Sequence, residues 1–110
     1  MAQRTNLNRK KLTILRRYAR FLRDNGLQIE KMIVFGSVAK GTACKESDLD
    51  VCVVSSLFGK DPIEESMRLS KLAMEIDYSL EPHPYSPKDL QEKFDPLAAE
   101  IRKHGVEIKI

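Results

Sequence analysis

Residues 34–51 read VFGSVAKGTACKESDLDV, in which a polar segment with two glycines lies between two short apolar segments. The residues that lead into it, Ile29–Phe35, end in a short apolar run and predict a strand buried on both faces. Leu49–Val54 predicts a second strand of the same kind. The segment between them is too polar to belong to a core. This part of the chain therefore predicts strand, polar loop, strand.

Two acidic residues stand at the start of the second strand. Side chains alternate across a strand, so Asp48 and Asp50 are expected to project to the same side with their carboxylates close together. Two like charges repel at this distance, and a divalent cation removes the penalty. Oxygen ligands select a hard ion, which predicts Mg²⁺, or Mn²⁺ in its place. The alternative is a pair of solvated turn residues without a ligand.

The glycine and serine that follow the first strand are suited to bind phosphate. Gly36 allows a tight turn and a close backbone approach to a ligand. If Ser37 begins a helical turn, its hydroxyl and the free backbone N–H groups can hold phosphate oxygens. Lys40 and Lys45 add positive charge nearby. Together with the acidic pair, this turn predicts a phosphate cradle that faces a metal site.

A third acidic residue is expected from a neighbouring strand. Residues 75–80 resemble a strand that ends at Pro82 and Pro84. Asp77 lies within this otherwise apolar run, where an unpaired carboxylate is unfavourable, and it is the predicted third ligand. Glu81 is the competitor, beside Pro82 where the strand is expected to end. A surface acid on an edge strand is the structural alternative for Asp77.

The remaining elements follow from periodicity and capping residues. Residues 8–25 form an amphipathic helix with one basic face, and the last residues alternate as a strand. Further helices are expected to begin where a capping residue precedes a proline, and Met67 and Met74 are expected to lie in the core. The fold class is α/β (α+β), a small mixed sheet flanked by helices in the order α-β-β-α-β-α-α-β. The predicted helix starts are Asp61-Pro62, Ser86-Pro87 and Asp95-Pro96.

Composition limits the class of protein. The chain has 110 residues, a formal net charge of +3 and 42% hydrophobic residues, which predicts one domain over residues 1–110 and argues against disorder. Two cysteines without metal-binding spacing argue against a zinc site. No membrane span or signal peptide is expected, so the protein is predicted to be soluble and cytoplasmic.

The first 25 residues carry eight Lys or Arg against one acid, which leaves an acidic body. A solvated basic surface explains this, and an anionic partner is the alternative. The aromatic residues of this helix, Tyr18 and Phe21, face its apolar side, so no stacking platform accompanies the arginines. Nucleic-acid binding is therefore not expected.

Residues 34–51 resemble the signature of the DNA polymerase β-like nucleotidyltransferases: Gly-Ser, ten residues, then Asp-x-Asp. The chain is most similar to the short members called minimal nucleotidyltransferases, and the resemblance covers nearly all of it. It implies that Gly36 and Ser37 position a nucleoside triphosphate and that Asp48 and Asp50 bind metals. Asp77 would be the third ligand or the general base.

One position departs from the family pattern. Many family motifs have Arg-Gly where this chain has Lys40-Gly41. Lysine keeps the charge that would help to bind the nucleotide but lacks the bidentate fork of arginine.

The resemblance also implies the reaction. A nucleoside monophosphate would be transferred to a hydroxyl acceptor with loss of pyrophosphate. It would be AMP if ATP is the donor, or the equivalent from another triphosphate. The chain has no room for an acceptor-binding domain, so the expected partner is a helical HEPN-type protein or a second copy in a homo-oligomer. The alternative is a non-catalytic or weakly catalytic antitoxin or regulatory module that acts by occlusion.

Overall fold

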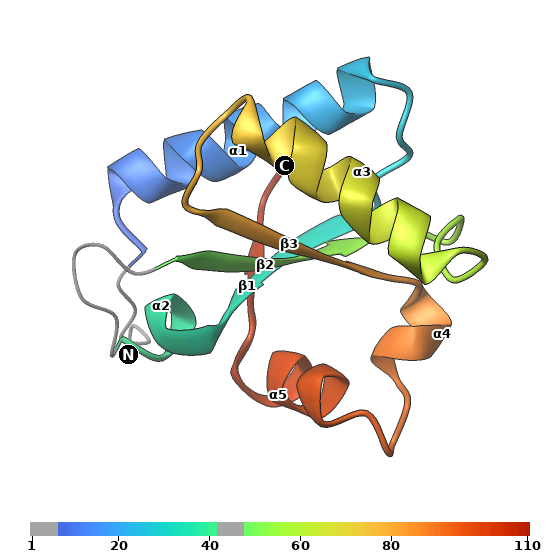
Figure 1. Cartoon of the computed structure of the whole chain (residues 1–110). Coiled ribbons are helices and arrows are strands. Elements are labelled where there is room, and N and C mark those ends of the chain that lie inside the picture. The colour runs from blue at the N-terminus through green and yellow to red at the C-terminus, as the bar shows by residue number, and fades with distance from the viewer. Residues whose placement is uncertain (1–6, 42–47) are drawn as a thin grey trace.

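The computed structural model describes residues 7–41 and 48–110, which form one sheet with helices on both faces (Figure 1). The predicted order of elements is confirmed, with one short helix added after the first strand. In chain order the elements are α1 (Arg9–Asp24), β1 (Lys31–Phe35), α2 (Gly36–Lys40), β2 (Leu49–Val54), α3 (Pro62–Met74), β3 (Leu80–Tyr85), α4 (Pro87–Leu90), α5 (Pro96–His104) and β4 (Val106–Ile108).

The sheet is mixed, with strand order β3-β2-β1-β4. β1 pairs antiparallel with both β2 and β4, whereas β2 and β3 are parallel. The register places Phe35 of β1 and Glu81 of β3 on either side of Asp50 in β2. The end of β1, the start of β2 and the start of β3 therefore meet at one end of the sheet.

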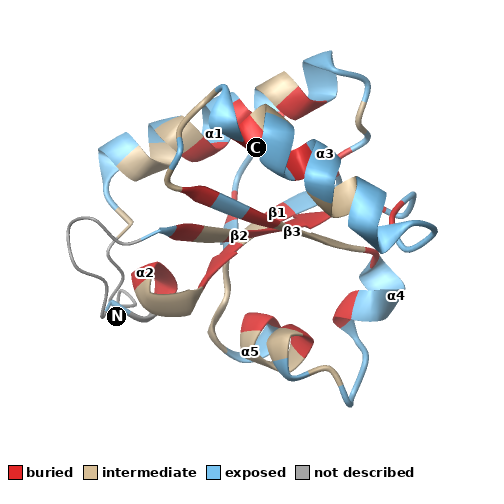
Figure 2. Cartoon of the chain, viewed as in Figure 1, coloured by how far each residue is buried: buried red, intermediate tan, exposed pale blue. Residues whose placement is uncertain are grey.

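The two faces of the sheet bury different sets of side chains. α1 and α3 cover one face, and α4 and α5 lie on the other (Figure 1). Along β2, Leu49, Val51 and Val53 belong to the larger core, whereas Cys52 and Val54 belong to the smaller core beneath α4 and α5. Figure 2 shows the buried residues along the strands and on the sheet-facing sides of the helices. By this alternation, Asp50 lies on the α4/α5 face.

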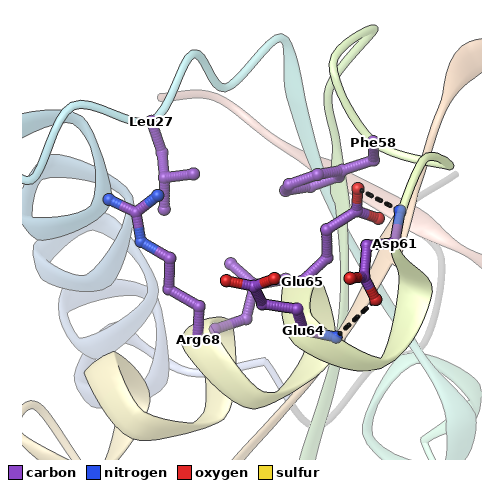
Figure 3. Close-up of a pocket in the computed structure, with 7 residues that line it drawn as sticks. Leu27, Phe58, Asp61, Glu64, Glu65 and Arg68 are labelled. Atoms are coloured by element: carbon purple, nitrogen blue, oxygen red, sulfur yellow. Dashed lines mark hydrogen bonds between the residues drawn. The ribbon is translucent and has the colours of Figure 1, made fainter.

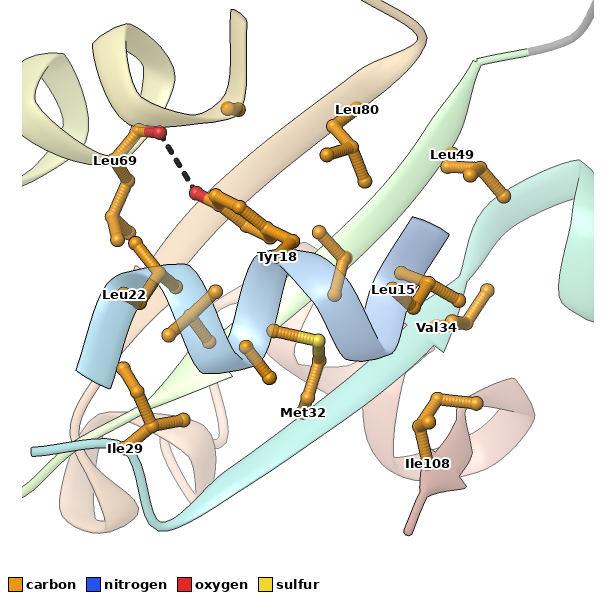
Figure 4. Close-up of a cluster of buried hydrophobic side chains, with 14 of the residues drawn as sticks. Leu15, Tyr18, Leu22, Ile29, Met32, Val34, Leu49, Leu69, Leu80 and Ile108 are labelled. Atoms are coloured by element: carbon orange, nitrogen blue, oxygen red, sulfur yellow. Dashed lines mark hydrogen bonds between the residues drawn. The ribbon is translucent and has the colours of Figure 1, made fainter. Parts of the chain in front are cut away.

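Tyr18 links the two helices of the larger core. Its ring is fully buried and its hydroxyl donates a hydrogen bond to the Leu69 carbonyl oxygen of α3 at 2.8 Å (Figure 4). Burial raises the pKa of Tyr18 well above its ordinary value. The apolar face predicted for the first helix is confirmed, since its buried residues are Leu15, Tyr18, Ala19 and Leu22.

The predicted helix starts are confirmed by their caps. The Asp61 side chain accepts a hydrogen bond from the Glu64 N–H at 3.2 Å. Asp95 Oδ1 accepts from two backbone N–H groups of α5, and Ser86 caps α4. Each cap is followed by a proline in the first turn, as the sequence pattern requires.

The prediction of a strand over residues 75–80 is wrong. α3 ends at Met74, a turn follows, and β3 begins at Leu80 and continues through both prolines. The carbonyl groups of Ser79 and Tyr85 accept hydrogen bonds from the N–H groups of Leu49 in β2 and of Ser55 just after it. By alternation, the backbone of Pro82 and Pro84 therefore faces the open edge of the sheet. A missing N–H costs nothing there and hinders pairing with another strand.

The prediction that Met67 and Met74 lie in the core is also wrong, because they are 67% and 76% exposed. α3 buries only a narrow stripe, Leu69 and Ala73, against α1 and the sheet. Among the helices of residues 7–41 and 48–110, none is both long and apolar enough to cross a bilayer.

Candidate active site

Asp50 lies at the centre of the candidate site. It is the second residue of β2, and its side chain is 28% exposed on the α4/α5 face. Asp48 comes just before the strand and is exposed. The two carboxylates therefore differ in setting: Asp50 is held by the sheet, whereas Asp48 reaches into solvent at its edge.

Gly36 makes room for the Asp50 carboxylate. Its φ is +76°, in the left-handed region that favours glycine, and a Cβ added here would lie 2.5 Å from Asp50 Oδ2. A glycine at this point thus lets the start of α2 approach the carboxylate closely. Phe35, the N-cap residue of α2, makes no side-chain cap. Ser37 and Lys40 lie in α2, and residues 42–47, which include Lys45, are outside the described residues.

Glu81 is the third acid that the structure brings to this point. It is paired with Asp50 across the parallel strands. A hydrogen bond shared with Asp50 raises the pKa of Glu81, and burial and the charges of Asp48 and Asp50 raise it further. The charges of the three carboxylates therefore interact, as is expected of a site that contains several acidic residues. The sequence pattern offered Glu81 only as the competitor of Asp77.

Asp77 has different neighbours. It lies in the turn before β3, where its Oδ1 accepts a hydrogen bond from the Ser79 N–H at 2.9 Å. Hydrogen bonds from Ser79 lower the pKa of Asp77, and the positive charges of Lys10 and Arg17 on α1 lower it further. The structure thus directs this carboxylate to the turn and to α1 and does not bring it to Asp50.

His83 lies beside the acidic group. Its Nε2 is 3.6 Å from Asp50 Oδ1, and its ring packs edge-on against Phe35 with centroids 5.2 Å apart. The strand that the sequence predicted to end at Pro82 and Pro84 includes His83 and continues to Tyr85. Because β3 contains both residues, the alternation of side chains along the strand puts His83 on the same face of the sheet as Glu81.

Two hollows flank the sheet. A groove of about 360 Å³ is lined by the end of β3, by the start of α3 and by Asp89 and Glu92, and His83 connects it with the surroundings of Asp50. The other hollow, of about 190 Å³, lies between Leu27, Phe58 and the first turns of α3.

Figure 3 shows the carboxylates of Asp61 and Glu65 in this second cavity turned toward backbone N–H groups. Glu65 accepts hydrogen bonds from the N–H groups of Gly59 and Asp61, at 2.9 and 3.3 Å. Together with the Asp61 cap, these bonds explain Asp61 and Glu65 by their structural role at the start of α3.

The donor set at Asp50 fits a divalent cation that is completed by its substrate. Within the described residues, no three His, Cys, Asp or Glu side chains stand ready as a full set of metal ligands. Mg²⁺, however, is commonly held by one or two carboxylates together with phosphate oxygens and water. Asp50 and Glu81, with Asp48 beside them, supply such a partial set of hard oxygen donors.

A mixed sheet with an acidic group facing a glycine-led helix is the arrangement of a nucleotidyltransferase domain. The family model described as "Nucleotidyltransferase domain" matches residues 15–107, and the chain belongs to this family. The family resemblance of residues 34–51 is confirmed. Comparison with curated proteins finds no match.

Solved structures with the same fold include a toxin–antitoxin with AMP-PNP, at 23% identity and a TM-score of 0.62, covering 89% of this chain and 72% of that one. A putative nucleotidyltransferase from Sulfolobus solfataricus has 16% identity and a TM-score of 0.65, covering 89% and 78%. A mutant of the toxin–antitoxin MntA-HpeT has 20% identity and a TM-score of 0.59, covering 86% and 70%. These likenesses confirm the predicted fold class.

Proposed function

We propose that this domain transfers a nucleoside monophosphate from a nucleoside triphosphate to a hydroxyl acceptor, in a reaction that depends on Mg²⁺. The observation that carries the proposal is the position of the Asp50 carboxylate, which lies against Gly36 at the start of α2 and is paired with Glu81 across the parallel strands. A glycine-led turn next to carboxylates supports the proposal, because nucleotidyl transfer needs backbone N–H groups for the phosphates and carboxylates for the cation.

Asp48, Asp50 and Glu81 would hold the cation, with Glu81 in the place that the sequence pattern assigned to Asp77. When bound, Mg²⁺ supplies neutralisation of the polyphosphate charge and activation of the attacking hydroxyl. The start of α2, with Gly36 and Ser37, would bind the phosphate oxygens and align the triphosphate for attack. Lys40, in the same helix, would add positive charge for the leaving pyrophosphate.

The donor we propose is ATP, and the acceptor a helical HEPN-type partner protein in the cytoplasm. Support comes from the fold shared with toxin–antitoxin proteins, one of them bound to AMP-PNP. A separate protein is suited to carry the acceptor because a protruding side chain could enter the groove beside His83, whose volume is about 360 Å³.

A second candidate is a module that inhibits a partner by occlusion. The specific observation in its favour is the exposed apolar face of α3, where Ile63, Met67 and Met74 are each at least two-thirds exposed. Exposed apolar groups of this kind are typical of protein-binding surfaces. The two functions are compatible, since an enzyme can also mask its substrate protein.

The test is to express the domain with the protein encoded beside it and to search both by mass spectrometry for an added nucleoside monophosphate. Repeating the experiment in vitro with each of the four ribonucleoside triphosphates identifies the donor. The Asp48→Asn/Asp50→Asn double variant is the control, because it removes charge without removing packing. Modification that survives in the double variant would exclude the proposed chemistry, and binding without modification would support occlusion.

A further inference from the structure

The Asp50 carboxylate presents its two oxygens to different neighbours. Oδ2 lies on the Gly36 side, where only a glycine leaves room for it. Oδ1 lies on the His83 side, 3.6 Å from Nε2. A carboxylate that is contacted from two sides has a defined orientation only if each oxygen has a partner of its own. The Gly36 side supplies space, whereas the His83 side places an N–H-bearing ring next to Oδ1, in addition to the neighbouring Glu81 of the parallel strand.

His83 has an unused polar atom at this place. Nε2 is buried and has no hydrogen-bond partner among the residues that the structure describes. A buried polar atom left unpaired is unfavourable, so a small shift that supplies a partner is favoured. At 3.6 Å the contact with Asp50 Oδ1 is too long for a hydrogen bond, but a movement of about 0.6 Å would form one of ordinary length.

The ring of His83 is also held in place. It packs edge-on against Phe35, at an interplanar angle of 60°, and its backbone is flanked by two prolines that restrict the strand. The cross-strand neighbour of His83 is the buried Cys52, while 35% of the His83 side chain stays exposed. Nε2 therefore lies on the buried part of the ring, next to one oxygen of Asp50.

We propose that His83 is a positioning residue: its Nε2–H donates a hydrogen bond to Asp50 Oδ1 and so orients this carboxylate toward the bound cation. The inference rests on the proposed function, because it assigns His83 to the same acidic site. Residues that orient a metal-binding side chain typically change metal affinity or activity by about 10–100-fold when they are removed.

The experiment measures the Mn²⁺ affinity of the domain by isothermal titration calorimetry in the presence of saturating AMP-PNP and without acceptor, because the carboxylates are only part of the ligand set. His83→Phe keeps the ring against Phe35 but removes the donor, and it is expected to weaken Mn²⁺ binding about 10–100-fold. His83→Gln places an amide N–H at a similar distance from the backbone and is expected to restore most of the loss. His104→Gln, which changes the other histidine of the chain, is the matched control and should bind as the wild type does.

Equal Mn²⁺ affinity in His83→Phe and wild type would overturn the inference while leaving the proposed function intact. A wild type that binds neither Mn²⁺ nor Mn²⁺ with AMP-PNP would instead overturn the proposed function. Electron spin-echo spectroscopy of the Mn²⁺-loaded domain separates positioning from direct ligation. A directly bound imidazole nitrogen that disappears in His83→Phe would make His83 a ligand and refute the positioning role, whereas its absence from the wild type supports that role.

Discussion

Replacing Gly36 by alanine should damage the site more than the fold. The added Cβ would lie 2.5 Å from Asp50 Oδ2, and ordinary van der Waals contact begins at 3.4 Å. The carboxylate must therefore move by about 0.9 Å. A misplacement of about 1 Å can cost on the order of 100-fold in rate, and we expect a loss of this size in nucleotidyl transfer by Gly36→Ala.

The chain contains a matched control for this variant. Gly26 also has a positive φ, +86°, but nothing lies within 4 Å of a Cβ added there. Alanine in the left-handed region costs about 1–2 kcal/mol at either position, and each kcal/mol lowers the Tm of a small domain by roughly 4–8 °C. Both variants should therefore lose stability, and only Gly36→Ala should lose the site.

Two assays separate these effects. Thermal unfolding reports stability, and the transfer of label from the α-phosphate of ATP to the modified partner reports the site, with the affinity for Mn²⁺ and AMP-PNP as a readout that needs no acceptor. If Gly36→Ala transfers label and binds the nucleotide as well as Gly26→Ala does, the close approach of α2 to Asp50 is irrelevant to function and the reasoning is refuted.

Three other variants test separate parts of the structure. Glu81→Gln should raise the Tm of the metal-free protein near pH 7 and reduce the stabilisation by Mg²⁺. The pKa of Glu81 is raised in the folded protein, so the contribution of Glu81 to stability is present below the ordinary pKa of 4.5 and is lost as pH rises through the pKa in the folded state. An unchanged response to Mg²⁺ would argue against Glu81 as a ligand. Asp77→Asn should leave the transfer rate near that of the wild type but lower the stability at neutral pH. Because the pKa of Asp77 is lowered in the folded protein, the difference in stability between variant and wild type should shrink as pH falls below 3.8 and through the pKa in the folded state. Loss of transfer with stability retained would restore Asp77 as the third acid. Tyr18→Phe leaves the Leu69 carbonyl oxygen without its donor and should cost about 1–2 kcal/mol in urea unfolding with an unchanged m-value, whereas an unchanged midpoint would show that this bond contributes nothing to stability.

Much of the fold was predictable because its signals are local. The second strand, Leu49–Val54, was predicted with its observed bounds from a short apolar run. Helix starts at Asp61, Ser86 and Asp95 followed from a cap and a proline, which act within one turn of the chain. The Gly36 turn and the acidic pair were predictable for the same reason, since both are defined by neighbours in sequence.

β3 shows where local signals fail. Proline is normally a reason to end a strand, and it is tolerated here only because β3 is an edge strand whose open side needs no N–H donors. Whether a strand lies at an edge depends on which other strands pair with it, and no local pattern carries that information. The early placement of this strand is also what favoured Asp77 over Glu81.

The amino-acid pattern alone determined the family, the helix starts, the first two strands and the glycine-led turn near Asp50, because each arises from residues close together in the chain. The parallel register of β2 with β3 brought Glu81 and His83 to Asp50 and left Asp77 at the turn, facing α1. A shift of one residue in that register would move both side chains to the other face of the sheet. Which residues lie in the acidic site therefore depends on how the strands pair across the sheet.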